Sequence, residues 1–352
     1  MTMTSSDLIK KLLVIFLIFA GIYYGRPILM PLCIGGILAT LFLPLTHWLE
    51  NKRWPKGLAV FVCLLIILLM VAILVTLLGW KISELVTDVG ALKQKAMMGL
   101  SQLQTYIYSH FGISVEKQSQ IMATEKPSYS NIMQLIAGSV VYIITNFILV
   151  LAFFCFLLYY RNHIKNFLIK LTVPTQRKEM GHLIFTASQV SQQYLVGLAK
   201  MIVCLWIMYG IAFSILGVKD AIFFAILCGV LEIVPFIGNL TGTTLTILIA
   251  ALHGAKFSML GGIVITYGVV QFIQGWLLEP VIVGPQVKIN PLFTIIALVL
   301  GQLLWGIPGI FLAIPLMAIF KIICDHIEPL KPLGFLIGEV KSQKSTRQKK
   351  EK

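Results

Sequence analysis

The sequence predicts an all-α polytopic membrane protein with about eight transmembrane segments. Hydrophobic residues make up 58% of the 352-residue chain and charged residues only 12%, and the mean hydropathy is +0.91. Soluble domains keep a much more polar balance. The net charge of +14 fits the same class, because membrane proteins concentrate Lys and Arg in cytoplasmic segments. We therefore expect an integral membrane protein that binds no nucleic acid.

Four continuous apolar stretches come first in the chain. A helix needs about 20 residues to cross roughly 30 Å of hydrocarbon, and these stretches meet or approach that length. The first follows Lys10 and Lys11 as a signal peptide would, but it runs on to Tyr24 without a small-residue cleavage site, so we expect a retained span. The predicted spans are Leu8–Tyr24, Ile28–Leu45, Leu58–Leu78 and Ile132–Tyr160, which divide into three helices in residues 1–79 and a fourth in residues 132–160.

Between the third and fourth spans, residues 80–131 have a mixed composition. Their apolar members, for example Ile82, Leu85 and Val89, recur at the period of an amphipathic helix. Pro127 marks a break before the next span. We expect an amphipathic helical insert outside the bilayer core.

Basic residues predict the orientation of the chain. Lys and Arg crowd residues 161–194, after the fourth span, and residues 325–352 at the end. By the positive-inside rule both segments are cytoplasmic, which places the N-terminus inside and the insert outside. We interpret the first as a cytoplasmic amphipathic linker and the second as a basic cytoplasmic tail, whose charges would also attract anionic headgroups.

Residues 195–324 show one order of elements twice, namely a span and then a long apolar run broken in its middle by Gly and Pro. The first unit is Leu195–Leu216 followed by Ala221–Leu252, broken at Pro235-Phe236-Ile237-Gly238-Asn239. The second unit is Phe257–Trp276 followed by Leu292–Ile323, broken at Gly306-Ile307-Pro308-Gly309. We interpret the two units as one transport module.

Each broken run is too long for one perpendicular span, and each half is too short to cross alone. Two geometries remain, a tilted and kinked span or a re-entrant hairpin that dips in and returns. Interruptions in corresponding places favour hairpins. The two units would then enter from opposite sides, as in the inverted-topology repeats of many secondary transporters, whose sites form at broken helices near the midplane.

Glu232 is the strongest single candidate for proton or cation coupling. It precedes Pro235 inside an otherwise apolar run, where a buried carboxylate without partners would be costly. The alternative is a carboxylate that caps free backbone N–H groups at the break.

Further polar groups and helix breakers lie close to the same interruptions. Glu279, directly before Pro280, could bind an ion or a polar substrate, or it could order an interfacial loop. Amide side chains suit a small polar solute that must lose its water in transit, although helix–helix hydrogen bonding is the alternative for each. With Glu232, the residues that we expect to line or support a transport path are Pro235, Gly238, Asn239, Gln271, Gln274, Glu279, Pro280, Asn290, Pro308 and Gly309.

Catalytic and metal-binding signatures are missing from the sequence. We find no P-loop, HExxH or GxSxG motif and no cluster of histidines. The six cysteines stand singly in or beside apolar runs, as small buried hydrophobic residues do. We therefore expect no enzyme, no cofactor, no metal site and no direct use of ATP.

Three ordered blocks resemble those of a known family. They are Ile233-Val234-Pro235-Phe236-Ile237-Gly238, the run Leu278–Gly284 followed by Asn290-Pro291, and the run Gly306–Leu316. They are similar to blocks of the autoinducer-2 exporter family, also called PerM-like permeases, and the similarity covers nearly the whole chain. It implies a bacterial cytoplasmic-membrane permease, in a family with members linked to autoinducer-2 export and others linked to sodium/proton exchange. The chain departs from that pattern at Asn239, where the family often has proline, and at Glu232, where an apolar or amide residue is expected.

These observations predict a secondary transporter that exports a small polar metabolite or signalling molecule such as autoinducer-2, with protons or sodium as coupling ions. Three alternatives stay open. They are a sodium/proton antiporter of the same family, a membrane scaffold that holds partners through the insert and the tail, and a channel. We expect a multi-pass protein of the bacterial cytoplasmic membrane with both termini in the cytoplasm. Expected partners are the solute, the coupling ion and membrane lipid, and the exposed insert leaves room for a homo-oligomer.

Overall fold

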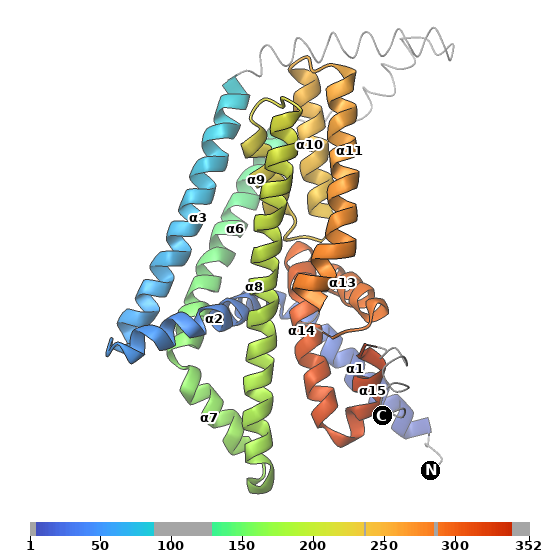
Figure 1. Ribbon diagram of the computed structural model, residues 1–352. Helices are drawn as coiled ribbons and strands as arrows, with labels where there is room; N and C mark the ends of the chain where they lie inside the picture. Colours follow the sequence, from blue (N-terminus) through green and yellow to red (C-terminus); the bar gives the residue numbers. More distant parts are fainter. Residues whose placement is uncertain (1–4, 88–128, 236, 285–287, 340–352) are drawn as a thin grey trace, which may run out of the picture.

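A computed structural model describes residues 5–87, 129–235, 237–284 and 288–339, and these residues are mainly helical (Figure 1). Among them, six helices are long and apolar enough to cross a membrane, and shorter apolar helices accompany them. This confirms the predicted all-α polytopic membrane fold. The α-helices are α1 Ser5–Tyr24, α2 Arg26–Asn51, α3 Lys56–Thr87, α6 Tyr129–Tyr159, α7 Arg161–Leu171, α8 Arg177–Ile215, α9 Ala221–Leu231, α10 Ile237–Leu252, α11 Phe257–Ile273, α13 Pro291–Trp305, α14 Ile307–His326 and α15 Lys331–Ile337; the π-helix η2 is Gln274–Val283, and short 3₁₀ turns are η1 Pro174–Gln176 and η3 Glu328–Leu330.

Helices α2, α3 and α6 form the first packed group. A Cβ at Gly35 of α2 would lie 2.9 Å from the backbone of Phe154 in α6, so this glycine permits a close helix contact. Phe154 and Cys63 of α3 are both fully buried between the three helices. The expected third span continues to Thr87, and most of the predicted insert lies outside the described residues.

Helix α8 runs without interruption over 39 residues, from Arg177 to Ile215, and so joins the second half of the predicted amphipathic linker to the span that follows it. No proline lies within this stretch, and the isolated Gly181 does not end the helix. At 1.5 Å per residue α8 is about 58 Å long, so it extends well beyond a hydrocarbon core of roughly 30 Å.

Both broken runs fold as antiparallel hairpins, as favoured by the sequence. In the first, a Cβ at Gly242 of α10 would lie 2.9 Å from the Cα of Cys228 in α9. In the second, Gly301 of α13 meets Gly309 of α14, and Gly306 makes the turn with a φ of +66°. In Figure 1 the α9–α10 hairpin lies in the upper half of the molecule, and α14 descends through the lower half.

The largest group of buried apolar residues joins α8, α9, α10 and α11. Tyr209 and Phe213 of α8, Phe224 and Cys228 of α9, and Ile263 of α11 belong to it, and each is at most 2% exposed. The first hairpin therefore packs between the helices α8 and α11, and residues at its turn are buried in the interior.

Candidate functional site

The first part of the candidate site forms at the turn of the α9–α10 hairpin. α9 ends at Leu231, Glu232 follows as its C-terminal cap, and the partly buried Pro235 lies in the turn. A Cβ at Gly238 would overlap the carbonyl oxygen of Leu231, so only glycine lets the start of α10 approach the end of α9 this closely. The turn places Glu232 and Asn239 in the interior, where they are 3% and 0% exposed.

Gln274 connects these two residues. Its Nε2 donates a hydrogen bond of 2.6 Å to Oε1 of Glu232, and Nδ2 of Asn239 lies 3.5 Å from its Oε1. Gln274 is itself 3% exposed and begins the π-helix η2 at the end of α11. π-helical turns are rare in proteins, and those that occur are often found at functional sites. Three residues that the sequence singled out separately thus form one buried, hydrogen-bonded chain.

Tyr209 and Thr243 complete this group, although sequence analysis did not select them. Both are buried, and the hydroxyl of Tyr209 on α8 faces the side chains of Asn239 and Thr243 on α10. Tyr209 Oη, Asn239 Oδ1 and Thr243 Oγ1 make no hydrogen bond of good geometry with another described residue. We call Tyr209, Glu232, Asn239, Thr243 and Gln274 the buried polar cluster.

A signal for Thr243 was present in the sequence, because it stands at the i+4 position from Asn239 and so shares its helix face. Tyr209 gave no such signal. It lies in a long apolar segment, where a tyrosine most often serves packing.

The second acidic candidate lies farther along η2, outside the cluster. Glu279 is partly buried and comes within electrostatic range of Tyr194 on α8. Gln271 is partly buried near the end of α11, and Pro280 is exposed on η2. A Cβ at Gly197 of α8 would lie 3.0 Å from the η2 backbone, so η2 and α8 pack closely here.

Three further candidates belong to the framework of the second hairpin. Asn290 caps α13, because its Oδ1 accepts a hydrogen bond of 3.0 Å from the backbone nitrogen of Leu292. Pro308 lies in the first turn of α14, where a missing N–H costs nothing. Gly309 permits the close contact with Gly301. Each of the three therefore has a clear role in building the hairpin.

Two cavities flank the buried polar cluster along the long helices. The first, which we call the upper cavity, has a volume of about 750 Å³ and is lined by the end of α8, including Leu216, and by the start of α11, including Met259. The second, the lower cavity, has a volume of about 510 Å³ and is lined by Gly197 of α8 and Val281 of η2. In both helices the cluster residue, Tyr209 or Gln274, comes between the two cavities in the chain. Along these two helices the cluster therefore lies between the cavities, and it shares no lining residue with either of them.

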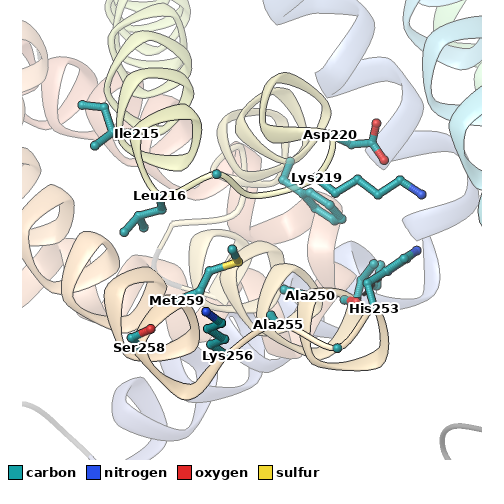
Figure 2. Close-up of a pocket in the computed structure, with 14 residues that line it drawn as sticks. Ile215, Leu216, Lys219, Asp220, Ala250, His253, Ala255, Lys256, Ser258 and Met259 are labelled. Carbon is teal, nitrogen blue, oxygen red and sulfur yellow. Dashed lines mark hydrogen bonds between the residues drawn. The ribbon is translucent and has the colours of Figure 1, made fainter.

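Ionisable side chains help to line the upper cavity (Figure 2). Lys219, Lys256 and His253 line it together with Asp220, which adopts a left-handed backbone conformation with a φ of +61°. The carboxylate of Asp220 lies 2.7 Å from Nζ of Lys81 on α3. This ion pair ties the α8–α9 turn to the end of the third span.

Three glutamine side chains contribute to the wall of the lower cavity. They are Gln189, Gln192 and Gln193 of α8, and Lys200 on the same helix lines the cavity with them. No member of the buried polar cluster is more than 3% exposed, and none of them lines either cavity.

The cluster combines groups that can bind a proton, a cation or a hydroxyl-bearing solute. A carboxylate in a low-dielectric interior is stable only when it is neutralised or well hydrogen-bonded. Glu232 meets an amide donor from Gln274, and the oxygens of Tyr209, Asn239 and Thr243 lie nearby. Such a site favours the binding of a proton or a cation to the Glu232 carboxylate.

The sequence matches the model of a known family over nearly its whole length. The model of the AI-2E family of transporters covers residues 12–328. A Bacillus subtilis (strain 168) protein with the provisional name of transport protein YrrI is 26% identical over 317 residues, which are 86% of this chain and 87% of the relative. The sodium-lithium/proton antiporter of Halobacillus andaensis is 24% identical, over 88% of this chain and 92% of that protein. The AI-2 transport protein TqsA of Escherichia coli (strain K12) is 21% identical, over 97% and 98%.

Proposed function

The chain belongs to the AI-2E family of transporters, and from this we propose that it is an ion-coupled secondary transporter in which Glu232 accepts the coupling ion. The observation that carries the proposal is the hydrogen-bonded chain Glu232–Gln274–Asn239 at the turn of a helical hairpin. We place the protein in the bacterial cytoplasmic membrane, with both termini in the cytoplasm and the upper cavity facing outward.

Burial supplies the physical reason for coupling. When the cluster is buried, as in this closed state, an ionised Glu232 would carry its charge into a dry interior at a cost of several kcal/mol. Neutralisation by a proton or a bound cation removes that cost. The protein therefore reaches the closed state most easily with the ion bound to Glu232. Because every transport cycle passes through this state, ion movement is linked to solute movement.

The hairpin is the element that we expect to move. Its turn meets α11 at the point where the α-helix becomes the π-helix η2. The regular pattern of α-helical hydrogen bonds is interrupted there. A small tilt of the hairpin against α8 and α11 would open the cluster to one cavity and keep it closed to the other. Broken helices at the interface of two repeats serve alternating access in this way.

The transported solute is, in our proposal, a small polar molecule. The hydroxyl and amide groups of Tyr209, Thr243 and Asn239 can replace the water that such a solute loses on entry. One relative is named as an AI-2 transport protein, which supports a molecule of this class as the cargo. We propose export as the direction of transport.

A sodium/proton antiporter is the second candidate. A single carboxylate surrounded by neutral oxygens suits a dehydrated alkali cation in exchange for a proton. A relative named as a sodium-lithium/proton antiporter supports this alternative.

Flux measurements with the purified protein in proteoliposomes distinguish the two candidates. A panel of small polar solutes is tested for counterflow, and proton movement is followed in parallel after addition of Na⁺ or Li⁺ without any solute. Saturable counterflow of a solute supports the exporter. Proton release driven by Na⁺ or Li⁺ alone supports the antiporter, and neither activity in an ion-tight, correctly folded preparation would contradict the proposal.

A further inference from the structure

A pocket with a volume of about 360 Å³ lies between α2, α7 and α8, and it shares Gln189 and Gln192 with the lower cavity. It shares no residue with the buried polar cluster. One part of its wall is polar and basic, with His47, Arg161 and Lys165, and another part is apolar, with Leu43, Ile184 and Phe185. We call it the basic pocket. Its two-sided wall suits a ligand that has an anionic group and a hydrocarbon chain.

The charge of this pocket is positive because one of its cations lacks a counterion. Arg161 pairs with Glu50 at 2.5 Å and donates to Oγ1 of Thr46 at 2.9 Å, so both of its guanidinium NH₂ groups are held by α2. Lys165, one turn further along α7, is exposed and forms no ion pair with a carboxylate in the described part of the chain. The Lys165 ammonium is therefore available for an anion.

Helix α7 has the character of a helix that lies in a membrane interface. None of its residues is buried, and its apolar side chains Ile164, Phe167, Leu168 and Leu171 are exposed although its basic side chains are also on the surface. A soluble protein would bury such an apolar stripe, and a lipid interface covers it without burial in protein.

Exposed aromatic residues near α7 also indicate the membrane interface. Trp48, Trp54, Tyr159 and Tyr160 are exposed close to the ends of α2 and α6, and Nζ of Lys52 lies 3.8 Å from the ring centre of Trp48. Trp and Tyr concentrate where headgroups meet hydrocarbon. Arg161 directly follows Tyr160, so the basic pocket lies at the level of the lipid headgroups.

We propose that the basic pocket binds an anionic phospholipid. The phosphate group would contact Lys165 and the polar wall, and an acyl chain would lie along Leu43, Ile184 and Phe185. The mixed wall and the exposed apolar face of α7 favour a lipid over a soluble phosphate. A bound lipid would fasten α7 and the first half of α8 to α2.

Native mass spectrometry of the delipidated full-length protein tests this site. Phosphatidylglycerol and phosphatidylcholine are titrated against the wild type, Lys165→Gln and Lys170→Gln. We expect Lys165→Gln to weaken phosphatidylglycerol binding about fivefold, as follows from roughly 1 kcal/mol per basic residue near the headgroups. Lys170 lies on the same helix but does not line the pocket, so its variant is the matched control and should bind as the wild type does.

A second variant tests the apolar wall. Phe185→Ser should weaken binding of long-chain phosphatidylglycerol and leave a short-chain analogue unaffected. Equal effects of Lys165→Gln and Lys170→Gln, or equal binding of both lipids by the wild type, would overturn the proposal. Displacement of the lipid by an equal concentration of inorganic phosphate would instead identify a site for soluble phosphate and would also overturn it.

Discussion

Gln274 donates a hydrogen bond of 2.6 Å to Glu232, although the two residues stand 42 positions apart in the chain. The bond connects the turn of the first hairpin with the start of the π-helix η2 on the following span. Both partners are buried, so neither finds water as a substitute. Because a buried hydrogen-bonding group that loses a partner is costly, this contact should hold the closed state together.

Removal of the Gln274 amide should lower the stability of the protein. We predict that Gln274→Leu lowers the free energy of unfolding by roughly 1–3 kcal/mol, because the Glu232 side chain loses the Gln274 donor inside the protein. Thermal denaturation in detergent measures the change. Gln271→Leu, a matched change on the same helix outside the cluster, should cost little, and equal losses in both variants would show that the contact has no special role.

The turn of the first hairpin should not tolerate a side chain at Gly238. We predict that Gly238→Ala destabilises the protein by roughly 1–3 kcal/mol, because the added methyl group would overlap the carbonyl oxygen of Leu231. Gly261→Ala is the control, since nothing lies within 4 Å of a Cβ at that position of α11. Similar melting temperatures for the two variants would contradict this packing of the hairpin.

The two cavities should be reached from opposite sides of the membrane. In a protein with its six cysteines replaced, we predict that Ser258→Cys in the upper cavity reacts with an impermeant maleimide added to whole cells. Gln192→Cys in the lower cavity should react only in inside-out vesicles. Labelling of both positions from one side would refute the proposed orientation.

The ion pair between Lys81 and Asp220 should couple α3 to the α8–α9 turn. Both side chains are largely buried, at 14% and 22% exposure, and we predict that Asp220→Asn lowers the free energy of unfolding by about 1 kcal/mol. The exchanged pair, Lys81→Asp with Asp220→Lys, should recover part of that loss. A double-mutant cycle measures the coupling, and strictly additive effects would mean that the pair contributes nothing.

Sequence patterns predicted the helical hairpins well because their cause is local. The breaks at Pro235 and Gly306 depend on proline, which disfavours a helix, and on glycine, which adopts a φ of +66° in the second turn. An apolar run of fixed length must then return. The polar first half of α8, which the sequence predicts as an amphipathic linker, is continuous with the following span because residues such as Gln192 and Gln193 continue a helix readily.

The composition of the buried polar cluster could be predicted only in part. Glu232, Asn239 and Gln274 were selected because polar groups are costly in apolar runs, but the same argument selected Asn290, which caps a helix. Which of these residues meet depends on how α9, α10 and α11 pack, and no local pattern encodes a contact such as that between Glu232 and Gln274. Tyr209 enters the cluster only through that packing.

The role of Glu232 in coupling is tested most directly by solute flux in proteoliposomes under imposed proton and sodium gradients. We predict that the wild type responds to one of the two gradients, that Glu232→Gln retains solute exchange without any response, and that Glu279→Gln responds as the wild type does. A Glu232→Gln protein whose flux still follows the gradient as strongly as the wild type would contradict the proposed coupling.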